Sequence, residues 1–327
     1  MTRLVAINAA LCAVLGLAAL AGAELWLRLT VPPSSPESIY EYTLATPRYK
    51  VMRPNARIVA FGEELRTNGL GFRDNHIAIP PKQPRETRIA VIGDSFTVSA
   101  GVAYRNIWTS LLERRLPSSR VINLGVGGYN IVQYRLVMEE VALKLQPDFI
   151  VVAVFPDNDF TNDTLDENHR RALGEPAPEE HWYDGLYLYK AYGARAQSWL
   201  NKFRPVANAG RGGDPKTAAW KENTDALLAM AAEAKERKIP FVVVSLPHTW
   251  HFDRQRPLFD RFHAFCREQG LSCINLLERF IASGADEATL RLNPLDAHPN
   301  ERYNALAARE MAAALGPYLR RPHTPQL

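Results

Sequence analysis

Short apolar runs separated by helical patterns are the feature that most constrains the fold of this 327-residue chain. Each run is rich in valine or isoleucine, and together they cover residues 88–92, 120–124, 148–154 and 240–246. Near-continuous apolar strands are typical of parallel sheets that helices cover on both faces. Helical spacing of apolar residues follows each run, near 105–116, 130–145, 216–237 and 255–269, and again near 300–315. The sequence therefore predicts a three-layer α/β/α fold around a mostly parallel central sheet.

A Gly-Asp-Ser triplet, Gly93-Asp94-Ser95, directly follows the first apolar run. A strand that stops at a glycine can lift a nearby serine hydroxyl out at the carboxyl edge of the sheet, where open α/β sheets place their chemistry. The same turn leaves backbone N–H groups at the start of the next helix, directed to where an oxyanion would form. The triplet alone is common in ordinary turns, so its meaning depends on the rest of the chain.

Three further segments follow in a definite order. The second run leads into Gly125-Val126-Gly127-Gly128, the third into Phe155-Pro156-Asp157-Asn158-Asp159, and Asp296-Ala297-His298-Pro299-Asn300 stands near the C-terminus. Together with the serine triplet, these segments resemble the four signature blocks of the GDSL/SGNH hydrolase family over about residues 86 to 315. The resemblance implies the flavodoxin-like SGNH hydrolase fold and a serine enzyme that acts on ester bonds.

The resemblance also implies a role for each polar residue. Ser95 would be the nucleophile, His298 the base that takes its proton, and Asp296 the group that orients the imidazole. The backbone of Ser95, the backbone of Gly128 and the side chain of Asn158 would form the oxyanion hole. Many family members carry Asp-x-x-His, whereas this chain has the shorter Asp-x-His of relatives that resemble polysaccharide O-acetylation proteins. Some members work with a Ser–His dyad, so the departure puts the role of Asp296 in question.

Other readings of the same loops are disfavoured. The acidic residues around Asn158 could bind calcium, but Asn162 and Asn168 stand where an EF-hand requires Gly and Glu. A dinucleotide loop at 125–128 is also disfavoured, because Asn130 replaces the last glycine of its pattern. We therefore expect no metal and no cofactor. A net charge of only +4, without a dense basic run, argues against nucleic acid as a partner.

The N-terminus carries twenty uncharged residues, Leu4 to Ala23, which just span a bilayer core. We expect an uncleaved membrane anchor, although Ala21-Gly22-Ala23 also fits a signal-peptide cleavage site. Arg3 and the α-amine precede the run, so the N-terminus should stay in the cytoplasm. The body would then face the extracytoplasmic side of the inner membrane, which is the periplasm in a Gram-negative cell.

The expected organisation is an anchor or signal peptide at 1–29, a linker and N-terminal extension at 30–85, and a hydrolase-like domain at 86–320. An insertion at about 160–215 interrupts the domain, and its aromatic residues, Trp182 among them, would cover the substrate or form a small core of their own. His248 and Trp250 follow the fourth run and would line the substrate site or belong to an aromatic loop.

Two cysteines outside the anchor, Cys266 and Cys273, are seven positions apart. An oxidising compartment would permit a disulfide between them. Two reduced, buried cysteines fit the spacing equally well, so the sequence leaves both states open.

Three functions fit these observations. The first is a membrane-tethered esterase that removes O-acyl groups, which we expect to be O-acetyl, from a cell-envelope glycan. The second is an O-acetyltransferase that passes the same acyl-serine group to a sugar hydroxyl of an exopolysaccharide or cell-wall glycan. The third is a non-catalytic glycan-binding assembly factor that keeps the fold. The intact set of Ser95, Gly128, Asn158 and His298 argues against the third.

Overall fold

The structure, a computed structural model, describes residues 2–30, 36–175, 185–189, 214–249, 251–293 and 296–319. Five parallel strands form its central sheet in the order β6-β5-β7-β8-β9. They are β5 (Thr87–Gly93), β6 (Ser119–Gly125), β7 (Phe149–Val154), β8 (Phe241–Ser245) and β9 (Cys273–Asn275). The predicted α/β fold with a parallel sheet is confirmed.

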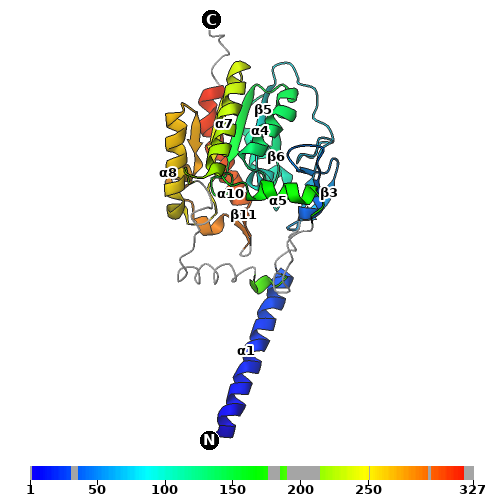
Figure 1. The fold of residues 1–327 in the computed structure, drawn as a ribbon, viewed down its shortest axis with the longest axis vertical. Coiled ribbons are helices and arrows are strands. Elements are labelled where there is room, and N and C mark those ends of the chain that lie inside the picture. The colour runs from blue at the N-terminus through cyan, green and yellow to red at the C-terminus, as the bar shows by residue number, and fades with distance from the viewer. Residues whose placement is uncertain are drawn as a thin grey trace.

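Helices cover both faces of this sheet (Figure 1). The strands divide their side chains between the two faces with a period of two: Ala90 and Ile92 belong to one core, Ile89 and Val91 to the other. Two helices, α4 (Ile131–Glu140) and α7 (Ala218–Glu236), pack on the first face. The second face is covered by α3 (Trp108–Arg115), α9 (Leu276–Ala282) and α10 (Glu301–Leu319), and α8 (Phe252–Glu268) contributes to both cores.

Several elements differ from the sequence prediction. The helix expected at 130–145 ends at Glu140, and a short 3-10 helix, Ala142–Leu145, follows it. The elements that were not predicted include the short α2 (Ser95–Val98), α5 (Asp163–Ala172), α9, and an antiparallel pair formed by β10 (Arg291–Asn293) and β11 (Asp296–Pro299). The last pair matters for function, because β11 carries the Asp-x-His segment.

The segment before β5 folds onto the body as two antiparallel hairpins. The first joins β1 (Tyr40–Tyr42) to β2 (Lys50–Met52), and the second joins β3 (Arg57–Ala60) to β4 (Glu63–Arg66). Four of its apolar residues are buried in the same core as the central strands: Ile39, Met52, Leu65 and Phe72. This segment, called the extension below (residues 36–85), is therefore packed against the sheet layer.

The first helix, α1 (Thr2–Thr30), projects away from the α/β body (Figure 1). Its Val5–Thr30 part has a mean hydropathy of 2.2 over its most apolar window, and none of that window is buried. By length and composition it can cross a membrane, although a signal sequence has the same character. Near its end, the Glu24 carboxylate accepts hydrogen bonds from the backbone N–H groups of Tyr187 and Leu188, at 3.1 and 2.9 Å.

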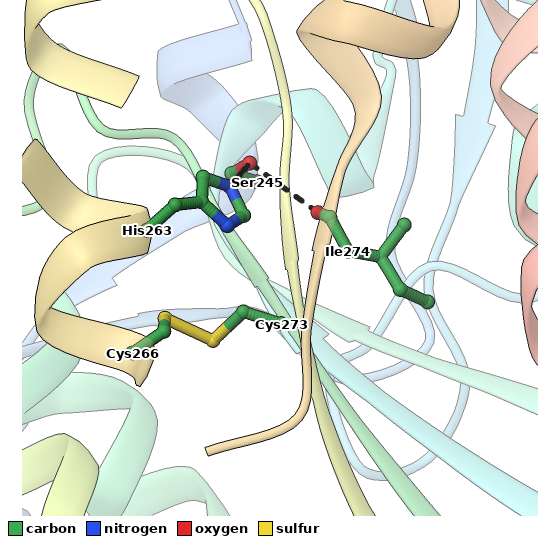
Figure 2. The surroundings of a disulfide bond; sticks show 5 residues. All are labelled: Ser245, His263, Cys266, Cys273 and Ile274. Atoms are coloured by element: carbon green, nitrogen blue, oxygen red, sulfur yellow. Dashed lines mark hydrogen bonds between the residues drawn. A yellow bond between two sulfur atoms is a disulfide. The ribbon is translucent and has the colours of Figure 1, made fainter. Parts of the chain in front are cut away.

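Cys266 and Cys273 form a disulfide, with their Cα atoms 6.2 Å apart. It joins α8 to the first residue of the edge strand β9, close to a buried hydrogen bond of 2.8 Å between Ser245 Oγ and His263 Nε2 (Figure 2). The structure thus selects the oxidised alternative of the two that the sequence left open.

Candidate active site

The Gly-Asp-Ser triplet forms a tight turn between β5 and α2. A side chain at Gly93 would place its Cβ 2.2 Å from Thr97 Oγ1 and 3.0 Å from the Ala153 carbonyl oxygen, so only glycine fits there. Asp94 caps α2, since its Oδ1 accepts a 2.9 Å hydrogen bond from the backbone N–H of Phe96. Ser95 is thereby placed at the first residue of the helix, at the carboxyl edge of the sheet.

The order of the strands brings the other two central segments to the same edge. β5 lies between β6 and β7, and Gly93 pairs with Gly125 on one side and Ala153 on the other. A Cβ placed on Gly127 would lie 3.7 Å from Ser95 Cβ, so the glycine turn after β6 borders the serine directly. Its next residue, Gly128, has a φ of 75°, which favours glycine. Asn158 follows β7, with its backbone N–H bonded to the Phe155 carbonyl oxygen.

Ser95, His298 and Asp296 form one continuous chain of hydrogen bonds. His298 Nε2 lies 3.0 Å from Ser95 Oγ, and its Nδ1 lies 2.6 Å from Asp296 Oδ1. The same carboxylate oxygen accepts a 2.8 Å hydrogen bond from the backbone N–H of His298. Residues two apart on a strand share a face, which explains how the short Asp-x-His spacing of β11 places both side chains together.

The charges around this chain of hydrogen bonds stabilise the protonated form of the His298 imidazole and the ionised form of the Asp296 carboxylate. Burial raises the pKa of Asp296, but the hydrogen bonds and positive charge of His298 outweigh it, so the net pKa is below the usual value. Burial lowers the pKa of His298, yet the hydrogen bond and charge of Asp296, together with the charge of Asp94, hold it above the usual value of 6.5.

A layer of rings lies against the serine and histidine. Phe96 and Phe155 stack with centroids 4.1 Å apart, and the His298 ring lies 5.8 Å from Phe96. His248 belongs to this layer, 5.6 Å from Phe155, and burial, followed by the charges of His298 and His251, lowers its pKa to about 4. His248 is therefore neutral at physiological pH. Trp182 and Trp250 lie outside the described residues.

The extension supplies contacts that the sequence analysis did not identify. Arg73 is almost fully buried, and its guanidinium donates hydrogen bonds to the carbonyl oxygens of Val98, Ser99 and Val102, just behind α2. Burial lowers the pKa of Arg73 to about 10, so it stays charged at neutral pH. It thus holds the helix that carries Ser95. The Thr67–Asp74 segment, rich in turn residues, was the one local signal for this element.

Two aromatic residues of the extension also border the site. The Tyr40 hydroxyl lies 2.4 Å from the position that a Cβ on Gly127 would occupy, next to Ser95. The Phe61 ring lies 6.5 Å, centroid to centroid, from the His298 ring. No local pattern marks either residue as part of the site, because their partners are distant in the sequence.

A serine hydrogen-bonded to a histidine–aspartate pair, at the carboxyl edge of a parallel sheet, is the arrangement of a serine hydrolase. The model of the GDSL-like lipase/acylhydrolase family matches residues 91–306, which is more than half of the chain. The chain belongs to this family. No curated protein matches it.

Several solved structures are similar to this chain at low identity. The psychrotrophic esterase EstA from Pseudoalteromonas sp. is 13% identical over 72% of this chain and 100% of its own, with a TM-score of 0.44. An acetylxylan esterase from Geobacillus stearothermophilus is 13% identical over 70% and 94%, with a TM-score of 0.42. A two-domain esterase active on acetylated mannans is 14% identical over 73% of this chain and 52% of its own, with a TM-score of 0.40. Such likenesses concern the fold alone.

Replacing Arg73 should destabilise the protein through the serine turn. Arg73→Met removes the guanidinium donors to the buried carbonyl oxygens of Val98, Ser99 and Val102, although the Ser99 oxygen still accepts a hydrogen bond from the Val102 N–H. We therefore expect the free energy of unfolding to fall by about 3 kcal/mol. Urea denaturation followed by circular dichroism measures this change. Arg53→Met, at an exposed position of the same extension, is the matched control and should stay within about 0.5 kcal/mol. Equal stability of the two variants would show that Arg73 does not support the turn.

Proposed function

We propose that this protein is a membrane-anchored serine esterase that removes O-acetyl groups from a cell-envelope glycan. The hydrogen-bond chain from Ser95 through His298 to Asp296 carries the proposal. In the first step, Ser95 Oγ bonds to the acyl carbon while its proton passes to His298 Nε2. The acyl–oxygen bond to the alcohol then breaks, and His298 gives the proton to the leaving alcohol. Water attacks the acyl-serine by the same route and regenerates Ser95.

The proposed oxyanion donors are the backbone N–H of Ser95, the backbone N–H of Gly128 and the side-chain amide of Asn158. Three neighbouring strands deliver them to one edge, and Ser95 lies at a helix start where backbone N–H groups are not used within the helix. Donors fixed in this way need no rearrangement as negative charge develops on the acyl oxygen. We keep His248, Trp250 and Trp182 as proposed substrate contacts, and only His248 lies within the described residues.

The proposed glycan substrate rests on the compartment. Arg3 and the α-amine precede the apolar helix, and basic residues are sparse from 29 to 47, so the positive-inside rule puts the body outside the cytoplasm. We accordingly propose an anchor at 1–29, a region at 30–85 that consists of a linker and the extension, and the hydrolase domain at 86–320, with its insertion at about 160–215. On that side of the membrane, the site would be able to reach O-acylated glycans of the cell envelope.

An O-acetyltransferase is the second candidate, and the short Asp296-x-His298 spacing favours it. That spacing resembles the last block of polysaccharide O-acetylation proteins, and β11 accommodates it with both hydrogen bonds made. Esterase and transferase share the acyl-serine intermediate. They differ only in whether water or a sugar hydroxyl reaches the acyl carbon, so the two are separated by the acceptor.

Turnover of p-nitrophenyl acetate by the full chain in detergent tests the chemistry. We expect Ser95→Ala to lower kcat by about 10⁴-fold or more, and the double variant with His298→Ala to be no worse, because the two residues act as one unit. Ser283→Ala, at the end of α9, is the matched control. Release of nitrophenol that requires an added glycan would favour the transferase. Turnover that survives Ser95→Ala would refute the catalytic role of Ser95 in both enzymes, whereas no turnover by the unaltered chain, with or without a glycan, would favour the glycan-binding assembly factor.

The pH profile of kcat/KM tests the role of Asp296. His298 must be neutral to accept the proton, so the rate should fall as the pH falls through its raised pKa, above 6.5. Asp296→Asn removes the hydrogen bond and charge of Asp296 that raise this pKa, and it leaves the charge of Asp94 and the burial that lowers the pKa. The acid limb should then move to lower pH, and kcat should fall by about 10²-fold or more. Asp253→Asn, almost fully exposed, is the control. An unchanged kcat together with an unchanged acid limb of the pH profile would identify a Ser–His dyad.

Reporter fusions test the location. An alkaline phosphatase fused after Leu327 should be active, and a reporter that works only in the cytoplasm should be silent.

Thiol counting on the unreduced, unfolded chain should find Cys12 alone free, since Cys266 and Cys273 are paired. Mass analysis distinguishes anchor from signal peptide, because cleavage would give a chain that begins at Glu24. A cytoplasmic body would remove the basis for a cell-envelope glycan and leave the Ser95 chemistry in place.

A further inference from the structure

The turn at the tip of the β3–β4 hairpin has an unusual residue in it. Ala60 pairs with Glu63, so the loop consists of Phe61 and Gly62 alone. Their φ angles are 53° and 83°, both left-handed, which is the pattern of a type I′ turn. Such turns favour Asn-Gly, and a bulky aromatic side chain at the first position is a clear outlier. The sequence therefore tolerates backbone strain at Phe61.

The surroundings of the Phe61 side chain give a reason for this backbone strain. Its half-buried ring lies 6.5 Å from the ring of His298, with the two planes tilted by 45°. The hairpin tip thus places an aromatic side chain next to the proposed catalytic base. Strained residues of this kind gather at functional sites, where the surrounding structure holds them in place. The hairpin precedes residue 91, where the match to the family begins, so this contact is a property of the extension.

The position of the Phe61 ring puts it on the side of the site where the alcohol half of the ester would lie. The leaving oxygen must come within hydrogen-bond reach of His298 Nε2, which faces Ser95 Oγ at 3.0 Å. The carbon skeleton attached to that oxygen then lies beside the imidazole, and so beside Phe61. A partly exposed aromatic ring offers a flat apolar surface, which suits the C–H face of a ring-shaped alcohol better than a small acyclic one.

We propose that Phe61 forms the alcohol subsite of this esterase and selects esters of cyclic alcohols, such as pyranosides. The inference rests on the proposed function, because it assigns the residue that binds the alcohol half of the ester in the same reaction. It makes Phe61 a specificity-determining residue: the ring binds the alcohol half of the ester, while Ser95 and His298 carry out the chemistry. A purely structural ring would instead affect all esters alike, through the orientation of His298.

The test compares two acetate esters that differ only in the alcohol: an O-acetylated methyl glucoside and ethyl acetate. We expect Phe61→Asn to lower kcat/KM for the acetylated glucoside about 10-fold, mainly through KM, and to leave ethyl acetate within twofold. This substitution creates the Asn-Gly turn that the hairpin geometry favours, so the melting temperature should stay the same or rise. Phe61→Tyr should retain the preference. Val59→Ala, which alters an exposed residue of the same hairpin, should change neither substrate.

A binding measurement separates this proposal from the esterase assignment. Saturation-transfer NMR with methyl glucoside reports occupancy of the alcohol subsite without turnover. We expect a signal with the full chain and with Val59→Ala, and its loss with Phe61→Asn. An equal loss of rate on both esters would make Phe61 a positioning residue, and no loss on either would overturn the subsite, as would absence of glucoside binding to the unaltered chain. Glucoside binding without Ser95-dependent turnover would retain the subsite and refute the esterase.

Discussion

The in-register pairing of β5 with β6 and β7 is the constraint on which the site depends. Gly93 pairs with Gly125 and with Ala153, so three neighbouring strands reach the same row before their turns begin. Backbone hydrogen bonds fix that row, and the serine, glycine and asparagine turns start side by side as a result. A slip of two residues in one strand would move its turn by about 7 Å, far beyond the reach of a hydrogen bond. The sheet therefore fixes the relative positions of the site residues, because each loop begins at a position that the strand pairing sets.

Buried carboxylates then fix the turns themselves. Asp94 caps the helix of Ser95, and Asp159 accepts hydrogen bonds from the Tyr134 hydroxyl and the Phe155 backbone, at 2.8 and 2.7 Å. Burial raises the pKa of both, that of Asp94 to about 6, and the charge of Asp94 raises that of Asp159 further. Burial of such acids lowers the stability of the protein, but the hydrogen bonds that they accept fix the geometry of the turns. Asp94 also has an electrostatic effect, because its negative charge helps to raise the pKa of His298.

Local patterns account for what the sequence could predict. The valine-rich runs identified the central strands. Three of the signature segments identified turns that the central sheet brings to one edge, and the fourth identified the Asp-x-His segment of β11, which meets them there. The contacts of the extension could not be predicted in this way, because Arg73 and Phe61 act on residues far along the chain and no spacing links them. Helix α5 has a polar sequence in which Asn168 is the buried residue. Its aliphatic residues are Leu165 and Ala172 alone, which are too few to indicate a helix by their spacing. The cysteine spacing was compatible with both redox states, and only the fold places the two Cα atoms 6.2 Å apart.

The extension links the apolar helix α1 to the part of the protein that holds Ser95. Helix α2 has only four residues, too few to be stable alone, and Arg73 supplies donors to the carbonyl groups at its end. The body that contains Ser95 is thus continuous with the packed segment that begins at Ile39. Only nine residue steps separate Ile39 from Thr30, the last residue of α1, and such a stretch reaches at most about 30 Å. On the proposed anchored arrangement, the esterase site is therefore restricted to substrates close to the membrane surface, whereas a cleaved signal peptide would remove that restriction.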